Sequence, residues 1–304
     1  MKYKNIVVTG GSGMVGKSLS RILKNGIFLS SKDYDLTLDS DVNKMFCDLK
    51  PDVIIHLAAK VGGIIDNINK PYDYFSENVL MNTLLLEHSR INNVKRFIGI
   101  LSTCIYPDVV SRYPMTEDML HIGPPTRTNF SYGYAKRCLA VQIDACNKQY
   151  GTKYQYLIPS NLYGENDKFG DNSHFVAALL EKVFDLIKNN KKTLKLYGTG
   201  SPMRQFMHSD DLAWVIYKCL EEEIYESFNV STEENLSIKE IATILLDIAN
   251  LNDVELIFDD KKPDGQYRKD VSISKLKEYI PNFTPLKLKE GLKIVYDKIS
   301  ERYY

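Results

Sequence analysis

The sequence NIVVTGGSGMVG occupies residues 5–16 of the 304-residue chain. A β-branched run over residues 5–9 precedes glycines at 10, 13 and 16, and helical spacing extends from Met14 to Lys24. Gly10 permits a tight turn, Gly13 allows the backbone to approach a pyrophosphate, and Gly16 allows close helix packing. The alternative is a glycine-rich turn without a ligand. The strand before and the helix after the glycines favour a dinucleotide-binding loop, because the helix N-terminus attracts phosphate.

The residues that follow alternate between apolar runs and helical patterns. Apolar runs cover Phe28–Ser31, Val53–Ala58 and Arg96–Leu101, and helical patterns cover Val42–Leu49 and Glu77–Ile91. Continuous apolar strands separated by helices are typical of a parallel sheet that is covered on both faces. The sequence therefore predicts an α/β fold with a doubly wound parallel sheet of the Rossmann type.

The pattern changes after about residue 160. Loops rich in Gly, Asn and Asp are followed by helical segments at Phe175–Lys188, Asp210–Glu223 and Ile238–Ala249, and a charged turn covers Lys261–Gly265. We expect a dinucleotide-binding domain over residues 1–164, rejoined by about 205–230. A smaller C-terminal α/β substrate-binding domain is expected over 165–304.

Composition excludes several classes of protein. Lys plus Arg and Asp plus Glu both number 39, so no bulk positive charge is available for nucleic acid. No apolar run approaches about 18 residues, so no membrane span is expected, and the N-terminus lacks signal-peptide features. The five cysteines are scattered without a C-x-x-C pair, which disfavours zinc and disulfides. No metal site is predicted, and a reducing cytoplasm is the expected location.

The tip of the second strand bears on the choice of nicotinamide cofactor. NAD-binding loops place a carboxylate there, whereas this chain has Ser31 and Lys32. A lysine attracts the 2′-phosphate of NADP, so NADP is favoured. Asp33 and Asp35 follow closely, and the alternative is that Lys32 is simply a solvated loop residue.

Catalytic candidates lie after the fourth apolar strand, Arg96–Leu101. Tyr132 and Lys136 are four residues apart within a helical pattern, which places both on one face. The ammonium is expected to lower the pKa of the tyrosine, which would then exchange a proton with a sugar oxygen.

Two further groups join this pair if the fold permits. Ser102 and Cys104 follow the strand that ends at Leu101, at the sheet edge where ligands bind, and they point the same way if the chain stays extended. A free cysteine is more often a buried apolar residue. His174 becomes an acid/base candidate only if it faces Cys104.

Together these motifs resemble the GDP-L-fucose synthase family of extended short-chain dehydrogenase/reductases. The resemblance rests on residues 58–64 (AAKVGGI), 102–107 (STCIYP), 159–164 (PSNLYG), 172–174 (NSH), 198–204 (GTGSPMR) and 262–269 (KPDGQYRK). It extends from about residue 5 to 295. Within the sequence, Thr103 replaces a serine common in the family, and Ser12 replaces an arginine found in some relatives.

The resemblance implies NADPH-dependent epimerisation at carbons 3 and 5 and reduction at carbon 4 of GDP-4-keto-6-deoxy-D-mannose, giving GDP-L-fucose. It implies that Cys104 and His174 exchange protons at the two carbons and that Tyr132 protonates the carbon-4 oxygen. Lys136 would tune Tyr132 and hold the nicotinamide ribose, and Ser102 would polarise the carbonyl. The expected cofactor contacts are Gly10, Gly11, Ser12, Gly13, Met14, Val15, Gly16, Ser31, Lys32, Asp35, Leu36, Leu57, Ala58, Ala59, Lys136, Pro159 and Leu162. The expected substrate contacts are Asn161, Lys182, Tyr197, Arg204 and Lys269.

Alternatives remain open at this point. The chain could reduce carbon 4 without epimerising, act on a related GDP-4-keto-6-deoxy sugar such as a heptose, epimerise carbon 4 with bound NAD, or sense NADP without catalysis. The Tyr132/Lys136 pair argues against a sensor. The resemblance also implies a homodimer formed by the helices of 77–91 and 132–148, whose apolar stripes could equally be core.

Overall fold

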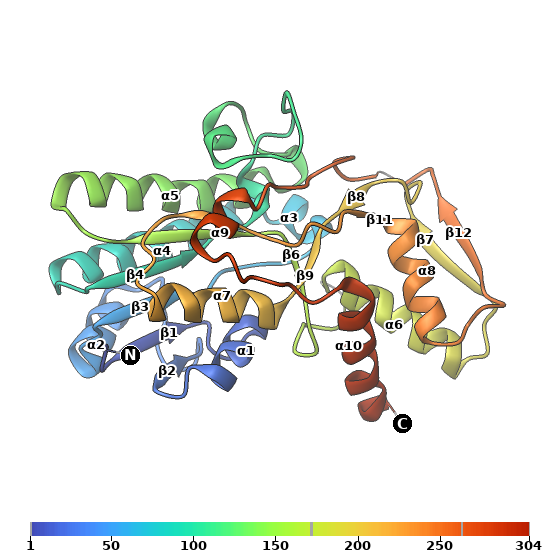
Figure 1. The fold of residues 1–304 in the computed structure, drawn as a ribbon, viewed down its shortest axis with the longest axis horizontal. Helices are drawn as coiled ribbons and strands as arrows, with labels where there is room; N and C mark the ends of the chain where they lie inside the picture. Colours follow the sequence, from blue (N-terminus) through green and yellow to red (C-terminus); the bar gives the residue numbers. More distant parts are fainter. Residues whose placement is uncertain (1, 171–172, 263, 304) are drawn as a thin grey trace.

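The computed structural model describes residues 2–170, 173–262 and 264–303. Asn172 and Pro263, which belong to motifs quoted above, lie outside the described residues. Six parallel strands form the main sheet in the order β10-β5-β4-β3-β1-β2 (Figure 1). Their bounds are β1 Ile6–Thr9, β2 Gly26–Leu29, β3 Val53–His56, β4 Arg96–Ile100, β5 Gln155–Pro159 and β10 Phe228–Val230. The strand order reverses between β1 and β3, which is where doubly wound sheets open a ligand crevice.

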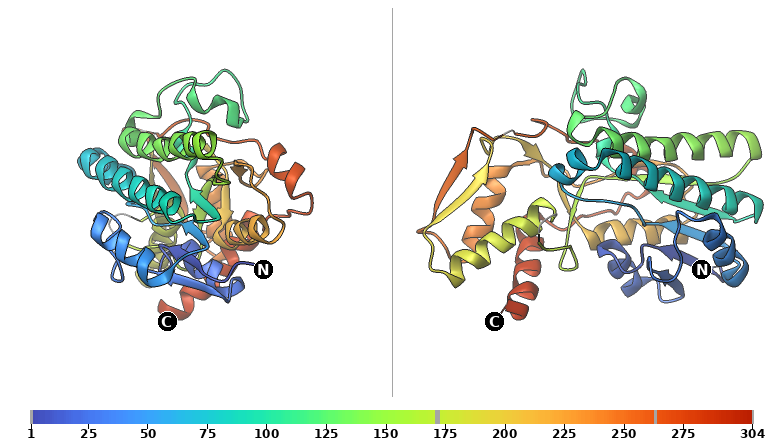
Figure 2. Two further views of the ribbon diagram at one scale, coloured as in Figure 1. Left: turned by 90° about the vertical axis from the view of Figure 1, so that its left-hand side faces the viewer. Right: turned by 180° about the vertical axis from the view of Figure 1, so that it is seen from behind.

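Helices cover both faces of this sheet, so the predicted fold class is confirmed. One face is covered by α1 (Met14–Ile22) and α7 (Ser209–Glu221), and the other by α2 (Asp39–Leu49), α4 (Pro71–Ile91) and α5 (Phe130–Tyr150) (Figure 2). Side chains alternate along each strand. Val8 therefore packs with the α1/α7 layer, while Val7 packs with the opposite layer.

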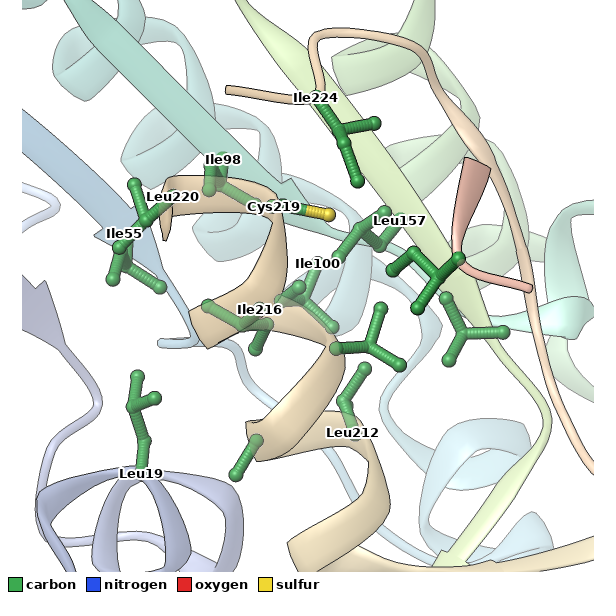
Figure 3. Close-up of a cluster of buried hydrophobic side chains, with 14 of the residues drawn as sticks. Leu19, Ile55, Ile98, Ile100, Leu157, Leu212, Ile216, Cys219, Leu220 and Ile224 are labelled. Atoms are coloured by element: carbon green, nitrogen blue, oxygen red, sulfur yellow. The ribbon is translucent and has the colours of Figure 1, made fainter. Parts of the chain in front are cut away.

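The core between the sheet and α7 consists mostly of aliphatic side chains. Figure 3 shows Leu212, Ile216 and Leu220 of α7 together with Cys219 of the same helix. They pack against side chains of three strands, namely Ile55, Ile98, Ile100 and Leu157. Since β10 and α7 come late in the sequence, chain beyond residue 205 contributes to the main sheet and its cover.

The C-terminal lobe has its own core. Strand β7 (Thr193–Tyr197) pairs in parallel with β12 (Glu255–Asp259), and α6 (Phe175–Lys188), α8 (Ile238–Ile248) and α10 (Leu288–Tyr303) share the third buried cluster. Two short pairings lie between the lobe and the main sheet. In these, β6 (Asn161–Tyr163) joins β9 (Phe206–His208), and β8 (Met203–Arg204) joins β11 (Leu236–Ser237).

Short helices complete the fold. They are α3 (Ile64–Asn69), α9 (Ser274–Tyr279) and the 3-10 turns η1 (Thr103–Ile105), η2 (Glu117–His121) and η3 (Arg127–Asn129). Among the helices that the structure describes, none combines the length and apolar character that a membrane crossing demands. The described ranges also contain no group of three or more acidic, His or Cys side chains placed to hold a metal ion.

Candidate active site

The glycine loop lies in the crevice between β1 and β3. Gly10 has φ +70°, and a Cβ built on it would lie 2.6 Å from the backbone nitrogen of Ala58. A Cβ on Gly16 would lie 2.4 Å from the carbonyl oxygen of Gly11, so α1 can approach the loop only because residue 16 lacks a side chain. Gly13 is the N-cap of α1, and a Cβ there would meet only the Gly10 carbonyl oxygen, at 3.2 Å. This bare cradle at a helix N-terminus fits a pyrophosphate.

The acids near the tip of β2 are hydrogen-bonded within their own turns. Ser31 and Lys32 are exposed beyond the end of the strand. The carboxylate of Asp33 instead accepts hydrogen bonds from the backbone and hydroxyl of Ser30, at 2.7 and 2.8 Å. The carboxylate of Asp35 likewise accepts from Thr37, and these local bonds lower the pKa of both acids. The acids are bound to their own turns, so the tip fits a phosphate at Lys32.

Other predicted cofactor residues lie at several places around the main sheet. Leu57 follows β3, and Leu162 lies on β6; both pack at the edge of the first buried cluster. Met14 lies below Gly164, since a Cβ built there would be 3.3 Å from its sulfur. Pro159 ends β5 opposite Val230, whereas Leu36 packs into the opposite core cluster.

The chain after β4 differs from the extended path that was expected. Ser102 is extended, but residues 103–105 turn into η1, and the Cys104 backbone N–H donates to Ser102 Oγ at 3.3 Å. The serine is therefore the N-cap of a short turn, because its hydroxyl accepts an N–H that the turn leaves free. The chain is not extended from Ser102 to Cys104, so the expectation that their side chains point the same way does not apply. Both side chains still lie at the carboxyl edge of the sheet.

Tyr132 and Lys136 lie on α5, but the expected lowering of the tyrosine pKa is wrong for this structure. Burial raises the pKa of Tyr132 well above its ordinary value, and the nearby charges of Cys104 and Tyr74 raise it further. Lys136 donates to the carbonyl oxygen of Ile100 at 2.8 Å, and burial lowers its pKa to about 8. Burial disfavours the charged phenolate, so Tyr132 is held as the protonated phenol.

Cys104 is half-buried and contacts a cation from the C-terminal lobe. The ammonium of Lys269 donates to Cys104 Sγ at 3.0 Å. Burial raises the pKa of the thiol, but the charge and hydrogen bond of Lys269, the Ser102 hydroxyl and the charge of Arg204 together bring it below its ordinary value. The thiol is thus biased toward the thiolate, the form that can act as a base.

His174 is the N-cap residue of α6 and carries a partner that the sequence reasoning missed. Its Nδ1 lies 2.9 Å from Oδ1 of Asp167. The bond raises the pKa of His174; burial and the charge of Lys168 oppose the rise, while the thiolate of Cys104 adds to it. Asp167 lies in the polar loop that follows β6, and an acid seven residues before the histidine was the available signal.

The predicted substrate residues divide into two groups. Arg204 and Lys269 lie near Cys104, and Asn161 on β6 donates to the carbonyl oxygen of Gln205 at 3.0 Å. In contrast, Lys182 donates to the Lys195 carbonyl oxygen at 3.0 Å, and Tyr197 is 73 % exposed. These last two lie in the lobe on α6 and β7, and their contact with substrate stays a prediction.

Comparison with known proteins places this site in a family. A profile described as the NAD dependent epimerase/dehydratase family matches residues 6–231. The chain belongs to that family. A GDP-L-fucose synthase of Dictyostelium discoideum is 36 % identical over 302 residues, covering 95 % of this chain and 93 % of that protein.

Two solved structures are also similar. A GDP-L-fucose synthetase of Naegleria fowleri bound to NADP has 31 % identity and a TM-score of 0.87, covering 98 % of this chain and 94 % of that one. A GDP-mannoheptose C4 reductase of Campylobacter jejuni with NADP bound has 27 % identity and a TM-score of 0.86, covering 97 % and 98 %. The expected resemblance to GDP-L-fucose synthases, the enzyme class and the NADP cofactor are thereby confirmed for this member of the NAD dependent epimerase/dehydratase family.

Proposed function

We propose that the chain converts GDP-4-keto-6-deoxy-D-mannose to GDP-L-fucose with NADPH, by epimerisation at carbons 3 and 5 followed by reduction at carbon 4. The observation that carries this proposal is that two sets of titratable side chains lie close together, since the charge of Cys104 acts on both Tyr132 and His174. Tyr132, Lys136 and Ser102 form one, and Cys104 and His174 form the other. A reductase needs only the first, whereas an epimerase also needs a base and an acid.

The favoured protonation states of Cys104 and His174 suit epimerisation. Cys104 is biased toward thiolate and His174 toward imidazolium. In each exchange a base takes a proton from the carbon beside the ketone, the electron pair passes into an enolate, and an acid returns a proton to the opposite face. We assign these roles to Cys104 and His174 because one is biased toward the basic form and the other toward the acidic form.

Tyr132, Lys136 and Ser102 suit the reduction at carbon 4. When bound, NADPH supplies the hydride. The raised pKa of Tyr132 keeps its proton in place until the carbon-4 oxygen becomes an alkoxide and accepts it. We assign Ser102 Oγ to hydrogen-bond that oxygen, and Arg204 and Lys269 to the GDP diphosphate, whose charge they match.

Incubation in heavy water with NADPH and the keto-sugar tests the whole sequence. We expect loss of NADPH absorbance and, by NMR, a fucose product with deuterium at carbons 3 and 5. NADPH loss without deuterium would overturn the epimerase assignment. No NADPH loss with any GDP-4-keto-6-deoxy sugar would overturn the enzyme assignment and leave a sensor.

A second candidate is reduction alone of a related GDP-keto-sugar. The similarity to a GDP-mannoheptose C4 reductase favours it. The same heavy-water experiment with a GDP-4-keto-heptose separates the two, because a pure reductase consumes NADPH and leaves the carbon-bound protons in place.

We further propose that the chain is a homodimer. Helices α4 and α5 lie side by side (Figure 1), and both present apolar side chains to the outside. These exposed side chains are Tyr72, Phe75, Leu80, Ile91, Phe130, Val141 and Tyr150. A two-fold axis through this face would bury them against their counterparts.

A further inference from the structure

The contact between Lys269 and Cys104 links a late segment of the chain to the edge of the main sheet. The atoms are 3.0 Å apart, and the residues are 165 positions apart in the sequence. Cys104 lies on η1 at the edge of the main sheet. Lys269 lies on the segment 264–271, which is held by a backbone bond from Met203 to Tyr267 at 2.8 Å and another from Met115 to Asp270 at 2.9 Å. Ordered backbone on both sides therefore fixes the sulfur opposite the ammonium.

The charged groups around the sulfur of Cys104 are mainly positive. Arg204 of β8 and Lys269 bring positive charge, His174 approaches from the start of α6, and Tyr132 approaches from α5 as a phenol. Among the ion pairs of the described residues, none includes Arg204 or Lys269. The neighbouring Arg268, by contrast, pairs with the carboxylate of Asp270. The sulfur is thus an anion that the protein offers to both cations, and the carboxylate of Asp264 also acts on Arg204.

We propose that Lys269 is a positioning residue whose ammonium, 3.0 Å from Cys104 Sγ, favours the thiolate in the empty site and is shared with the diphosphate when the substrate binds. The inference rests on the proposed function, because it requires a nucleoside diphosphate as the substrate handle. Its consequence is that the sulfur becomes a stronger base only when a substrate is present.

The chemistry follows from the donor capacity of an ammonium. Lysine has three N–H donors, so one ammonium can contact sulfur and a phosphate oxygen together. A diphosphate carries more negative charge than the sulfur, so it weakens the hydrogen bond and the charge attraction between Lys269 and Cys104. The thiolate then takes a proton from the sugar: the C–H bond breaks, an S–H bond forms, and the electron pair remains on the substrate as an enolate.

Alkylation of Cys104 by iodoacetamide as a function of pH tests the proposal on the full chain. Mass spectrometry follows the Cys104 peptide, and exposed Cys47 is an internal reference. We expect Lys269→Met to raise the pH of half-maximal alkylation by about one unit, the usual size of the effect of one adjacent charge. Lys269→Arg should remain near wild type, as should Lys261→Met, an exposed lysine that precedes this segment in the sequence. GDP should raise the midpoint in wild type and leave it unchanged in Lys269→Met.

Equal midpoints in wild type and Lys269→Met would overturn the proposal. If Lys269→Met does not fold, the thiolate absorbance of wild type minus Cys104→Ser gives the same titration, and its indifference to GDP would overturn the shared ammonium. The alkylation without GDP does not depend on the sugar. A shifted midpoint together with absent NADPH oxidation would therefore reject the proposed function and retain the role of Lys269.

Discussion

The imidazole of His174 is held by a buried carboxylate, with 2.9 Å between its Nδ1 and Oδ1 of Asp167. The side chain of Asp167 is only 5 % exposed, whereas that of His174 is 41 % exposed. The carboxylate fixes the orientation of the ring through Nδ1, and the proposed proton transfer would use Nε2. Such an arrangement both positions the imidazole and stabilises its protonated form.

Asp167→Asn should therefore weaken epimerisation by shifting the titration of His174. The carboxylate raises the pKa of His174, so the imidazolium persists above its ordinary range. Without the charge, the imidazolium is lost at lower pH, and the alkaline limb of the deuterium-exchange profile moves to lower pH. We expect a loss of about 10- to 100-fold in exchange rate. Asp185→Asn, an exposed acid of α6, is the matched control. An unchanged profile in Asp167→Asn would show that the carboxylate is only structural.

Tyr132→Phe and Cys104→Ser should separate the two halves of the reaction. Removing the phenol takes away the proton for the carbon-4 oxygen, so NADPH oxidation should fall about 10²- to 10⁴-fold while deuterium exchange continues. Removing the thiol should abolish exchange. Both are read in one NMR and absorbance experiment, with Tyr217→Phe as control, a half-buried tyrosine of α7 whose hydroxyl donates to Glu221. Parallel loss of both activities in both variants would contradict separate roles.

The pH dependence of the reduction should reflect Lys136. Burial lowers its pKa to about 8, so the ammonium is present below that pH and lost above it. If Tyr132 is supported by that charge, kcat/KM for reduction should decline above about pH 8. Lys136→Arg keeps its charge at all working pH values and should remove this decline, even where it lowers the plateau. A decline of the same midpoint in Lys136→Arg would assign the titration to another group.

Gly10 of the glycine loop can be compared with Gly151, which lies outside the loop and has nearly the same backbone conformation. Gly10 and Gly151 have φ +70° and +67°, but a Cβ on Gly10 would lie 2.6 Å from Ala58 N, whereas Gly151 faces open space. The left-handed conformation costs either alanine about 1–2 kcal/mol. Gly10→Ala should lose stability beyond this amount and also NADPH binding, measured by urea unfolding and fluorescence titration. Equal NADPH affinity in both variants would exclude the loop from the cofactor site.

Local patterns in the sequence were sufficient to predict most of the helices and strands named above. Helix α6 has the bounds Phe175–Lys188 that its apolar spacing predicted, and the apolar runs became β1, β3 and β4 with small shifts. Helix α4 begins at Pro71, six residues before its predicted start at Glu77, because its first turns are mostly polar or exposed. Apolar periodicity registers only the buried face of a helix.

The site was less predictable because its energetics depend on distant contacts. Lys269 meets Cys104 across 165 positions, which no local spacing reveals. The pKa of Tyr132 depends on desolvation, which requires the surrounding core, so an argument from the adjacent lysine alone gave the wrong direction. Asp167 was within reach of the sequence, but a single acid in a polar loop has no distinguishing pattern.

The outer faces of α4 and α5 lead to a prediction about assembly. Val141 is 50 % exposed on α5 and belongs to the apolar set proposed to meet its counterparts in a second copy. Val141→Lys would place like charges near the two-fold axis, so we expect it to sediment as a monomer where wild type sediments as a dimer. Ile257→Lys on β12, at 37 % exposure, introduces the same charge outside this face and should leave the dimer intact. Wild-type protein that sediments at 34.8 kDa at micromolar concentration would reject the homodimer, and a dimer in Val141→Lys would move the interface away from these two helices.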